Sequence, residues 1–221
     1  MVRTYISLIT SFLLAGSLNT AAFAGGGHHS DIEVGLRNNQ LTTEGRVFEG
    51  EFSFTNGFWI TDDPGFEGDA GLFAAGTTIG FNIIAALGLW NGNGFDTLDP
   101  FSHASITLEL GPLSATTGAG FISGFNFVAD ASGGFDSHLD FILNGPDALA
   151  GEPADGVYLI ELQLISNNYL ASESFWIVFG KGADHREIDA AMDWVEANLV
   201  PAPGALLLLG MAAFGAARRR V

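Results

Sequence analysis

The chain has 221 residues, of which 48% are hydrophobic and 12% aromatic, enough apolar material for one domain with a sizeable core. It carries 25 acidic residues against eight basic ones, and four of the basic residues lie in the two end segments, so the part between Asp31 and Glu196 has a net charge of −21. This charge repels nucleic-acid phosphates and anionic lipid headgroups, which argues against nucleic-acid binding. The sequence has no cysteine, which excludes disulfides, thiolate metal sites and a cysteine nucleophile.

The N-terminal segment has the features of a secretory signal peptide. Arg3 precedes an apolar run from Ile6 to Leu18, which is followed by the small-residue sequence Ala22-Phe23-Ala24. We therefore expect signal peptidase to remove residues 1–24 and the rest of the chain to be exported. The alternative, a first transmembrane anchor, is disfavoured because the apolar run is shorter than the roughly 20 residues that a bilayer core requires.

Residues 25–183 are expected to form a β-sheet body. Four segments alternate apolar and polar residues with a period of two, as half-buried strands do: 48–54, 104–110, 121–129 and 139–143. Three further segments are apolar on both faces, as central strands are: 77–89, 157–165 and 174–179. Turn sequences such as Asp63-Pro64-Gly65 and Asn91-Gly92-Asn93-Gly94 separate these segments. The pattern predicts a mainly β fold, an antiparallel β-sandwich or a jelly-roll-like pair of sheets.

The period of the apolar residues changes at residues 184–199. Asp184 followed by Glu187 is an aspartate version of the capping box that begins many helices. One helical stripe then contains the apolar residues Ile188, Ala191, Met192, Val195 and Leu199. These features predict an amphipathic helix of about 14 residues that packs on the body.

The C-terminal segment, residues 200–221, has three parts. The sequence Val200-Pro201-Ala202-Pro203 comes first, residues 204–217 carry no charge, and Arg218, Arg219 and Arg220 follow. Residues 201–217 are at the lower length limit of a spanning helix, and arginine side chains can extend to the interface to cover the shortfall. The arginines should stay on the cytoplasmic side, which leaves the body outside. We therefore predict a short transmembrane helix in this tail.

This tail closely resembles the PEP-CTERM sorting signal of Gram-negative bacteria, with Ala202 where the family name has glutamate. The resemblance implies recognition by exosortase, a membrane-embedded, transpeptidase-like cysteine enzyme, and removal or exchange of the tail. It further implies transit through the inner membrane to the outer envelope, the cell surface or the extracellular matrix, where exopolysaccharide is an expected partner. The alternative is a plain C-terminal anchor in the inner membrane.

Two short segments contain the residue types of a metal site. His28 and His29 precede Asp31, and Asp136 lies two residues before His138. Residues two apart in a strand point to the same face, so each segment could chelate from one side if the two strands are neighbours. The predicted ligands of a zinc or copper ion are therefore His28, His29, Asp31, Asp136 and His138. The alternative is a disordered mature N-terminus and a surface histidine at 138.

Calcium is a third metal to consider. The acidic, glycine-rich segment 61–71 and the loop 91–96 offer oxygen ligands, although a body this acidic has solvated carboxylates in many loops.

The body also resembles bacterial surface-anchored sheet domains through His29-x-Asp31, through His138 with Phe141, and through Gly156-Val157-Tyr158. That resemblance implies a sheet fold on the cell surface.

The sequence contains no nucleophile elbow, phosphate-binding loop or dinucleotide fingerprint, so we do not expect an enzyme. Trp59, Trp90 and Trp176 are candidates for stacking on sugars in a carbohydrate-binding or carbohydrate-active module, but each also lies in or beside an apolar run that suits the core. The sequence thus favours an exported, non-enzymatic envelope or matrix protein, with a metal-binding surface protein as the alternative and a carbohydrate module as the second alternative.

Overall fold

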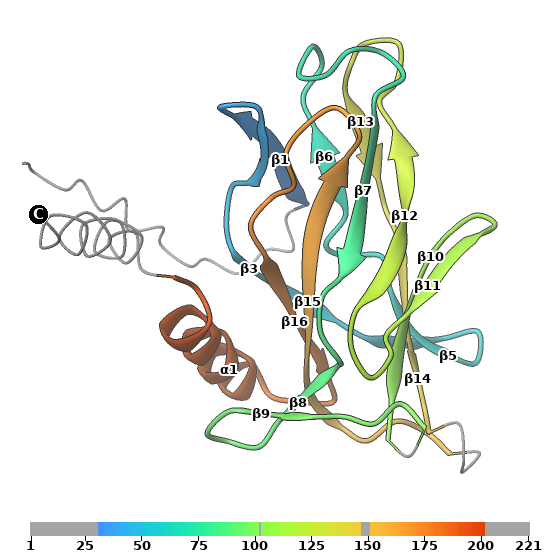
Figure 1. Ribbon diagram of the computed structural model, residues 1–221. Coiled ribbons are helices and arrows are strands. Elements are labelled where there is room, and N and C mark those ends of the chain that lie inside the picture. The colour runs from blue at the N-terminus through green and yellow to red at the C-terminus, as the bar shows by residue number, and fades with distance from the viewer. Residues whose placement is uncertain (1–30, 102, 147–150, 202–221) are drawn as a thin grey trace, which may run out of the picture.

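The computed structural model describes residues 31–101, 103–146 and 151–201 of the chain. Within these ranges the chain forms 16 β-strands followed by one α-helix (Figure 1). The prediction of a mainly β fold with one helix is therefore confirmed. The strands are β1 (Ile32–Arg37), β2 (Gln40–Thr43), β3 (Val47–Glu51), β4 (Ser53–Thr55), β5 (Phe58–Thr61), β6 (Phe66–Gly68), β7 (Thr78–Ile83), β8 (Gly88–Trp90), β9 (Phe95–Thr97), β10 (Ser105–Leu110), β11 (Leu113–Thr116), β12 (Ile122–Val128), β13 (Phe135–Ser137), β14 (Asp140–Asn144), β15 (Gly156–Ser166) and β16 (Phe175–Lys181).

A seven-stranded sheet forms one layer of the molecule, with the strand order β12-β7-β15-β16-β3; the short strand β8 also pairs with β15, and β9 pairs with β8. The interior strand β16, which lies between β15 and β3, is buried along its whole length, as the apolar run 174–179 predicts. The predicted strand 77–89 is instead two strands, β7 and β8, with a break between them. One face of the sheet contributes to the main hydrophobic core and the other is covered by the helix.

The other layer is made of two smaller sheets that meet end to end. A four-stranded sheet has the order β13-β6-β1-β2, and a five-stranded sheet has the order β11-β10-β14-β5-β4. The chain passes from one sheet to the other twice, from β5 to β6 through residues 62–65 and from β13 to β14 through residues 138–139. Aromatic pairs such as Phe66–Phe175 and Phe141–Phe179 join this layer to the seven-stranded sheet. The junction between the two smaller sheets positions the candidate site described below.

The expectation of purely antiparallel sheets is wrong in two places. β1 pairs with β6 in parallel, and β3 pairs with β16 in parallel. Strands joined by short turns, such as β1 and β2, pair antiparallel, whereas these two pairs join segments far apart in the chain, whose connections allow either direction.

The predicted amphipathic helix is confirmed as α1 (His185–Asn198). The Asp184 side chain accepts a hydrogen bond from the Glu187 backbone N–H at 3.1 Å, which caps the first turn. Ile188, Ala191 and Val195 are buried against the outer face of the seven-stranded sheet. A side chain at Gly180 would collide with Ile188, since its Cβ would lie 2.6 Å from the Ile188 Cδ1 atom. This glycine therefore lets the helix approach the sheet closely.

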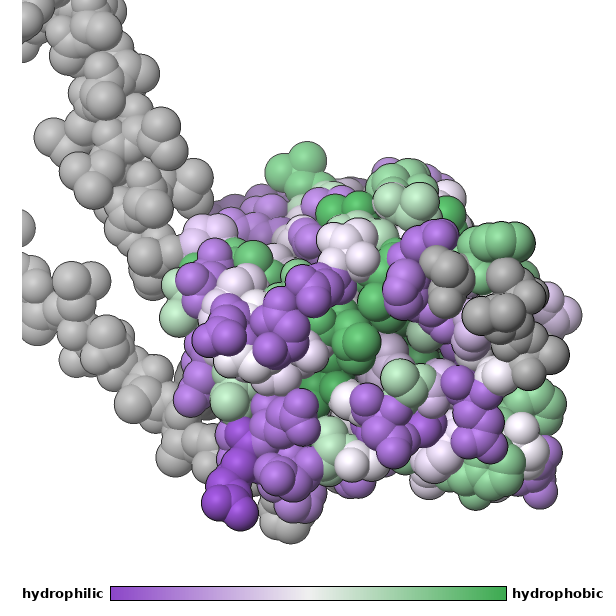
Figure 2. All heavy atoms as spheres, turned by 90° about the horizontal axis from the view of Figure 1, so that it is seen from below, coloured by the Kyte–Doolittle hydropathy of each residue, from purple (hydrophilic) through white to green (hydrophobic). Residues whose placement is uncertain are grey.

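Apolar side chains also reach the surface at the end of the molecule seen from below. Figure 2 shows a central hollow with an apolar floor, surrounded by hydrophilic residues, at this end.

The apolar-polar alternation predicts that Phe54 and Phe121 lie in half-buried strands. Both side chains are exposed instead, Phe54 in β4 and Phe121 just before β12. Phe54 lies on a hairpin at the sheet edge, and Phe121 precedes the first paired residue of its strand, so neither is covered by a second layer.

The predicted signal peptide, residues 1–24, lies outside the described residues. So do Ala202, Pro203, Arg218, Arg219 and Arg220 of the predicted sorting tail. Val200 and Pro201 are described, and the Val200 backbone N–H donates to the Val195 carbonyl at 3.2 Å. Among the described residues, no helix combines the length and the apolar character needed to cross a bilayer.

Candidate metal centre

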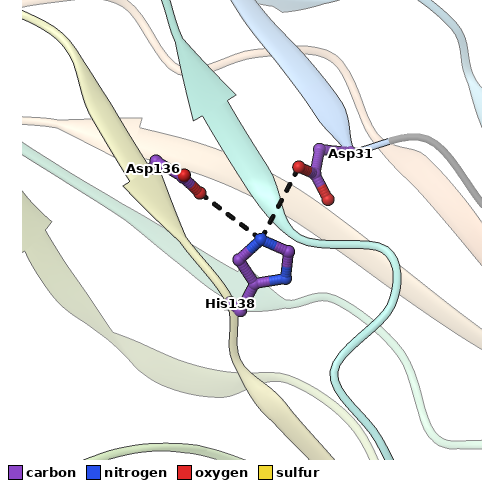
Figure 3. A group of neighbouring side chains, drawn as sticks. All are labelled: Asp31, Asp136 and His138. Carbon is purple, nitrogen blue, oxygen red and sulfur yellow. Dashed lines mark ion pairs between the residues drawn. The ribbon is translucent and has the colours of Figure 1, made fainter.

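Three of the predicted metal ligands lie together: Asp31, Asp136 and His138 (Figure 3). His138 Nε2 is 3.6 Å from Asp31 Oδ2 and 3.4 Å from Asp136 Oδ1. One ligand atom from each residue lies within 4.8 Å of the others. The structure thus brings together the two segments that the sequence suggested, while His28 and His29 lie outside the described residues.

The sequence predicts that the two segments lie on neighbouring strands, and this prediction is wrong. Asp31 directly precedes β1, whereas Asp136 and His138 belong to β13 and the residue after it, and β6 lies between these strands. Phe66 of β6 pairs with Ile32 on one side and with Ser137 on the other. If the same register is continued by one residue, Asp31 and His138 lie on either side of Gly65. The site therefore spans three strands.

Gly65 makes this meeting across β6 geometrically feasible. A Cβ atom at this position would lie 2.7 Å from Asp31 Oδ1 and 2.9 Å from His138 Nδ1, closer than real contacts allow. The Gly65 backbone N–H also donates to Asp31 Oδ1 at 3.0 Å, and the Ile32 N–H donates to the Gly65 carbonyl at 2.8 Å. The sequence indicated only a turn at Asp63-Pro64-Gly65, so the role of this glycine could not be recognised without the strand register.

The imidazole of His138 is oriented from its other nitrogen. Nδ1 lies 3.3 Å from the carbonyl oxygen of Asp62, which can only accept, so Nδ1 donates and Nε2 faces the two carboxylates. Metal-binding histidines typically donate their other ring N–H to a carbonyl in this way, which fixes the orientation of the ring. Partial burial lowers the pKa of His138, but the Asp62 carbonyl and the carboxylates of Asp31 and Asp136 together outweigh it and raise the pKa. The carboxylates of Asp31 and Asp136 thus favour a positive charge between them, whether on the protonated imidazole or on a bound metal ion.

The donor set is one imidazole nitrogen and two carboxylate oxygens. Imidazole suits zinc and copper, whereas calcium takes oxygen ligands almost exclusively. The side chain of Asp136 is 71% exposed and that of His138 is 42% exposed, so the centre opens to solvent on one side. A tetrahedral ion held by these three residues would keep one position open for a further ligand.

The alternative calcium loops do not gather ligands in the same way. Within the described ranges, Asp31, Asp136 and His138 form the one group of three or more acidic, histidine or cysteine side chains close enough to share an ion. In the loop 91–96, the Asn91 side chain donates to Asp96 and accepts from the Asn93 backbone N–H, so the loop closes on itself. The structure therefore favours the centre at His138 over the two acidic loops.

A row of four carboxylates crosses the four-stranded sheet beside the centre. Glu67 of β6 pairs with Glu33 of β1 on one side and with Asp136 of β13 on the other. The Glu44 backbone N–H donates to the Glu33 carbonyl at 3.1 Å, which extends the row past the end of β2. Paired residues of adjacent strands point to the same face, so like charges stand opposite one another along the row. No sequence pattern indicated this row, because it depends on the register of four strands.

Glu44 is the member of this row whose ionisation should affect stability most. Burial raises the pKa of Glu44 to about 7, against an ordinary value of 4.5, and the neighbouring Glu33 carboxylate adds to the rise. The folded protein therefore holds this proton more tightly than the unfolded chain, and stability falls as the pH rises from about 4.5 to about 7.

We expect Glu44→Gln to be more stable than the wild type at pH 8, because glutamine mimics the protonated acid. The expected rise in Tm is roughly 2–4 °C, since the Glu44 side chain is exposed and screening by water limits the effect to about 1 kcal/mol. At pH 4.5 the two proteins should melt within about one degree of each other. Thermal unfolding at both pH values checks this, with the exposed Glu152→Gln as the control. A gain of equal size at both pH values would contradict the prediction.

The tryptophans proposed for sugar stacking are largely engaged within the protein. Trp176 is buried in the cluster under α1, as the apolar run around it predicts, so it is not available to stack on a sugar. Trp59 is half-buried, with Lys181 Nζ 4.1 Å from its ring centre. Trp90 is half-buried against Phe95 and Trp194.

Comparison with known proteins adds no assignment to this geometry. No model of a known protein family matches the chain, and no curated protein matches it. The description of the centre therefore rests on the residues of this chain alone.

Proposed function

We propose that this chain is an exported, non-enzymatic β-sheet protein that binds one divalent metal ion, zinc by preference, through Asp31, Asp136 and His138. The observation that carries the proposal is the position of His138 Nε2 between two carboxylates, at 3.4 and 3.6 Å. The Asp62 carbonyl orients the ring from behind, and the missing side chain of Gly65 leaves room for the three ligands. The three ligand atoms therefore converge, and the ring is held in its orientation by a group that does not touch the ion.

Zinc is preferred because the three ligands combine one imidazole nitrogen with two carboxylate oxygens. Zinc binds such nitrogen and oxygen donors, usually in a tetrahedral arrangement. Copper is the second candidate: it binds imidazole and carboxylate more tightly than zinc at equal availability, but copper(II) favours square-planar or tetragonal rather than tetrahedral sites. Calcium is third, because the imidazole occupies a position that calcium would fill with oxygen.

The predicted export route gives this site its setting. The signal peptide and the PEP-CTERM-like tail support processing by signal peptidase and exosortase, followed by delivery to the outer envelope, the cell surface or a matrix that contains exopolysaccharide.

The two-layer arrangement supports a classification as a β-sandwich of the jelly-roll type.

Cell fractionation with intact mass analysis tests the predicted export route: the mature protein should lie outside the inner membrane and lack Arg218, Arg219 and Arg220. Recovery of the intact tail from inner-membrane fractions would contradict it.

The metal site is tested by zinc titration of chelator-treated protein purified without a histidine tag. We expect one zinc ion per chain. His138→Ala should weaken zinc binding by at least about 100-fold, more than the loss of a group that only orients a metal ligand. His185→Ala is the matched control, because His185 lies at the start of α1, away from the centre, and its loss should leave the affinity unchanged.

A second variant keeps the test valid if His138→Ala folds poorly. Gly65→Ala retains all three ligands but places a Cβ among them, and the side chains it meets can shift, so the fold should persist while zinc binds at least about ten-fold more weakly. Gly120→Ala is its control, because a Cβ at Gly120 meets nothing within 4 Å.

Three outcomes would overturn the proposal. The first is equal zinc affinity in the wild type and His138→Ala. The second is loss of binding on replacing His28 and His29 by alanine with no loss in His138→Ala, which would place the ion on the N-terminal segment alone. The third is tighter binding of calcium than of zinc, which would reject the choice of metal.

A further inference from the structure

We infer that the metal ion, if it binds as proposed above, controls how firmly the hairpin formed by β1 and β2 is attached to the rest of the protein. The reason is the distribution of the ligands. Asp31 is on the chain entering β1, while Asp136 and His138 are on the far side of β6. An ion held by all three residues therefore links β1 to β13 across the intervening strand.

The attachment of this hairpin through backbone hydrogen bonds is limited. The β1–β6 ladder has two paired positions, Ile32 with Phe66 and Glu33 with Glu67. The outer strand β2 is the last strand of its sheet. Beyond β1, the hairpin exchanges two backbone hydrogen bonds with Leu170, through Asn39 and Leu41, and the Gln40 side chain donates to the Ala171 carbonyl at 3.0 Å. Apolar burial holds the hairpin in addition, because Ile32, Val34 and Leu41 are fully buried. The hairpin is thus folded onto the core but joined to its sheet by few bonds.

The charges of the same sheet oppose this attachment. Glu33 stands between Glu44 and Glu67, and Asp31 contributes a further carboxylate one row away. Like charges directly opposite one another on adjacent strands are destabilising. The repulsion acts across the β1–β6 junction, where the ladder is short, and a divalent cation at Asp31 would reduce it. The ion would therefore shift the balance between the attached and the detached hairpin toward the attached form.

The size of this shift follows from linkage. If detachment separates Asp31 from Asp136 and His138, the detached form cannot bind the ion through all three ligands. Zinc at about 100 times its Kd should then reduce the population of the detached form by about 100-fold. The β8–β9 hairpin provides an internal comparison, because it lies beside β15 and shares no residue with the centre.

Hydrogen exchange of the full chain with and without zinc measures this directly. We expect the backbone amides of 32–43 to exchange about 100-fold more slowly with zinc at 100 times its Kd, and those of the β8–β9 hairpin to change by less than about two-fold. Calorimetric binding of zinc with unchanged exchange in 32–43 would overturn the inference while leaving the proposed function intact. Absence of zinc binding would instead reject the proposed function.

Two isosteric variants distinguish a link between strands from general stabilisation. Asp31→Asn removes the ligand on β1 but keeps an acceptor for the Gly65 N–H, whereas Asp136→Asn leaves one ligand on each side of β6. Each variant is studied at 100 times its own Kd for zinc. Asp136→Asn should retain most of the slowing in 32–43 and Asp31→Asn should lose it. Equal slowing in both variants would overturn the inference.

Discussion

Phe179→Ala is expected to lower the free energy of unfolding by about 3–5 kcal/mol. Phe179 lies in β16 and is fully buried. Its ring stacks on Phe52 at 4.9 Å and meets Phe141, in the opposite layer, at 5.0 Å. A Cβ at Gly50 would lie 2.5 Å from the ring, so the ring fills the space above this glycine. Its removal would leave a cavity between two layers whose backbones are held by their own ladders and cannot close it.

Urea denaturation monitored by circular dichroism measures the effect of Phe179→Ala. Phe58→Ala is the matched control, because the same atoms are removed from a side chain that is 57% exposed, and its cost should stay within about 0.5 kcal/mol. If the two variants lost the same stability, the assignment of Phe179 to the contact between layers would be wrong.

Asp155→Ala is expected to destabilise the protein more than Lys181→Met, although methionine replaces the more buried residue. Lys181 is 3% exposed, its ammonium group pairs with Asp155, and it lies over the ring of Trp59. Removing the aspartate leaves a buried charge without its counterion, at a cost of about 2–3 kcal/mol, below the usual range for buried pairs because Asp155 itself is 73% exposed. Methionine removes the charge but keeps the apolar stem against Trp59, so a change within about 1 kcal/mol is expected.

The same denaturation measurements on Asp155→Ala, Lys181→Met and the double variant form a thermodynamic cycle. The double variant should be about as stable as Lys181→Met, since no buried charge remains in either. A larger cost for Lys181→Met than for Asp155→Ala would show that the ion pair itself, rather than the need to neutralise the lysine, stabilises this part of the fold.

Features that depend on neighbouring residues could be predicted from the sequence. The helix 185–198 follows from a capping aspartate and an apolar stripe, both of which act within one or two turns. The buried strand 175–181 follows from a run that is apolar on both faces. The pairing of Asp136 with His138 on one face is likewise a property of the strand itself, because side chains two residues apart point to the same side.

The register between distant strands was decided only by the tertiary structure. Asp31 reaches His138 because β6 runs between their strands and is preceded by Gly65, which has no side chain to separate them. The same register aligns Glu33, Glu67 and Asp136 across the sheet. The sequence by itself therefore determined which residues could bind a metal and which face of their strand they occupy. Only the packing of the whole chain decided which of them meet, because strand register depends on contacts between segments that no local pattern records.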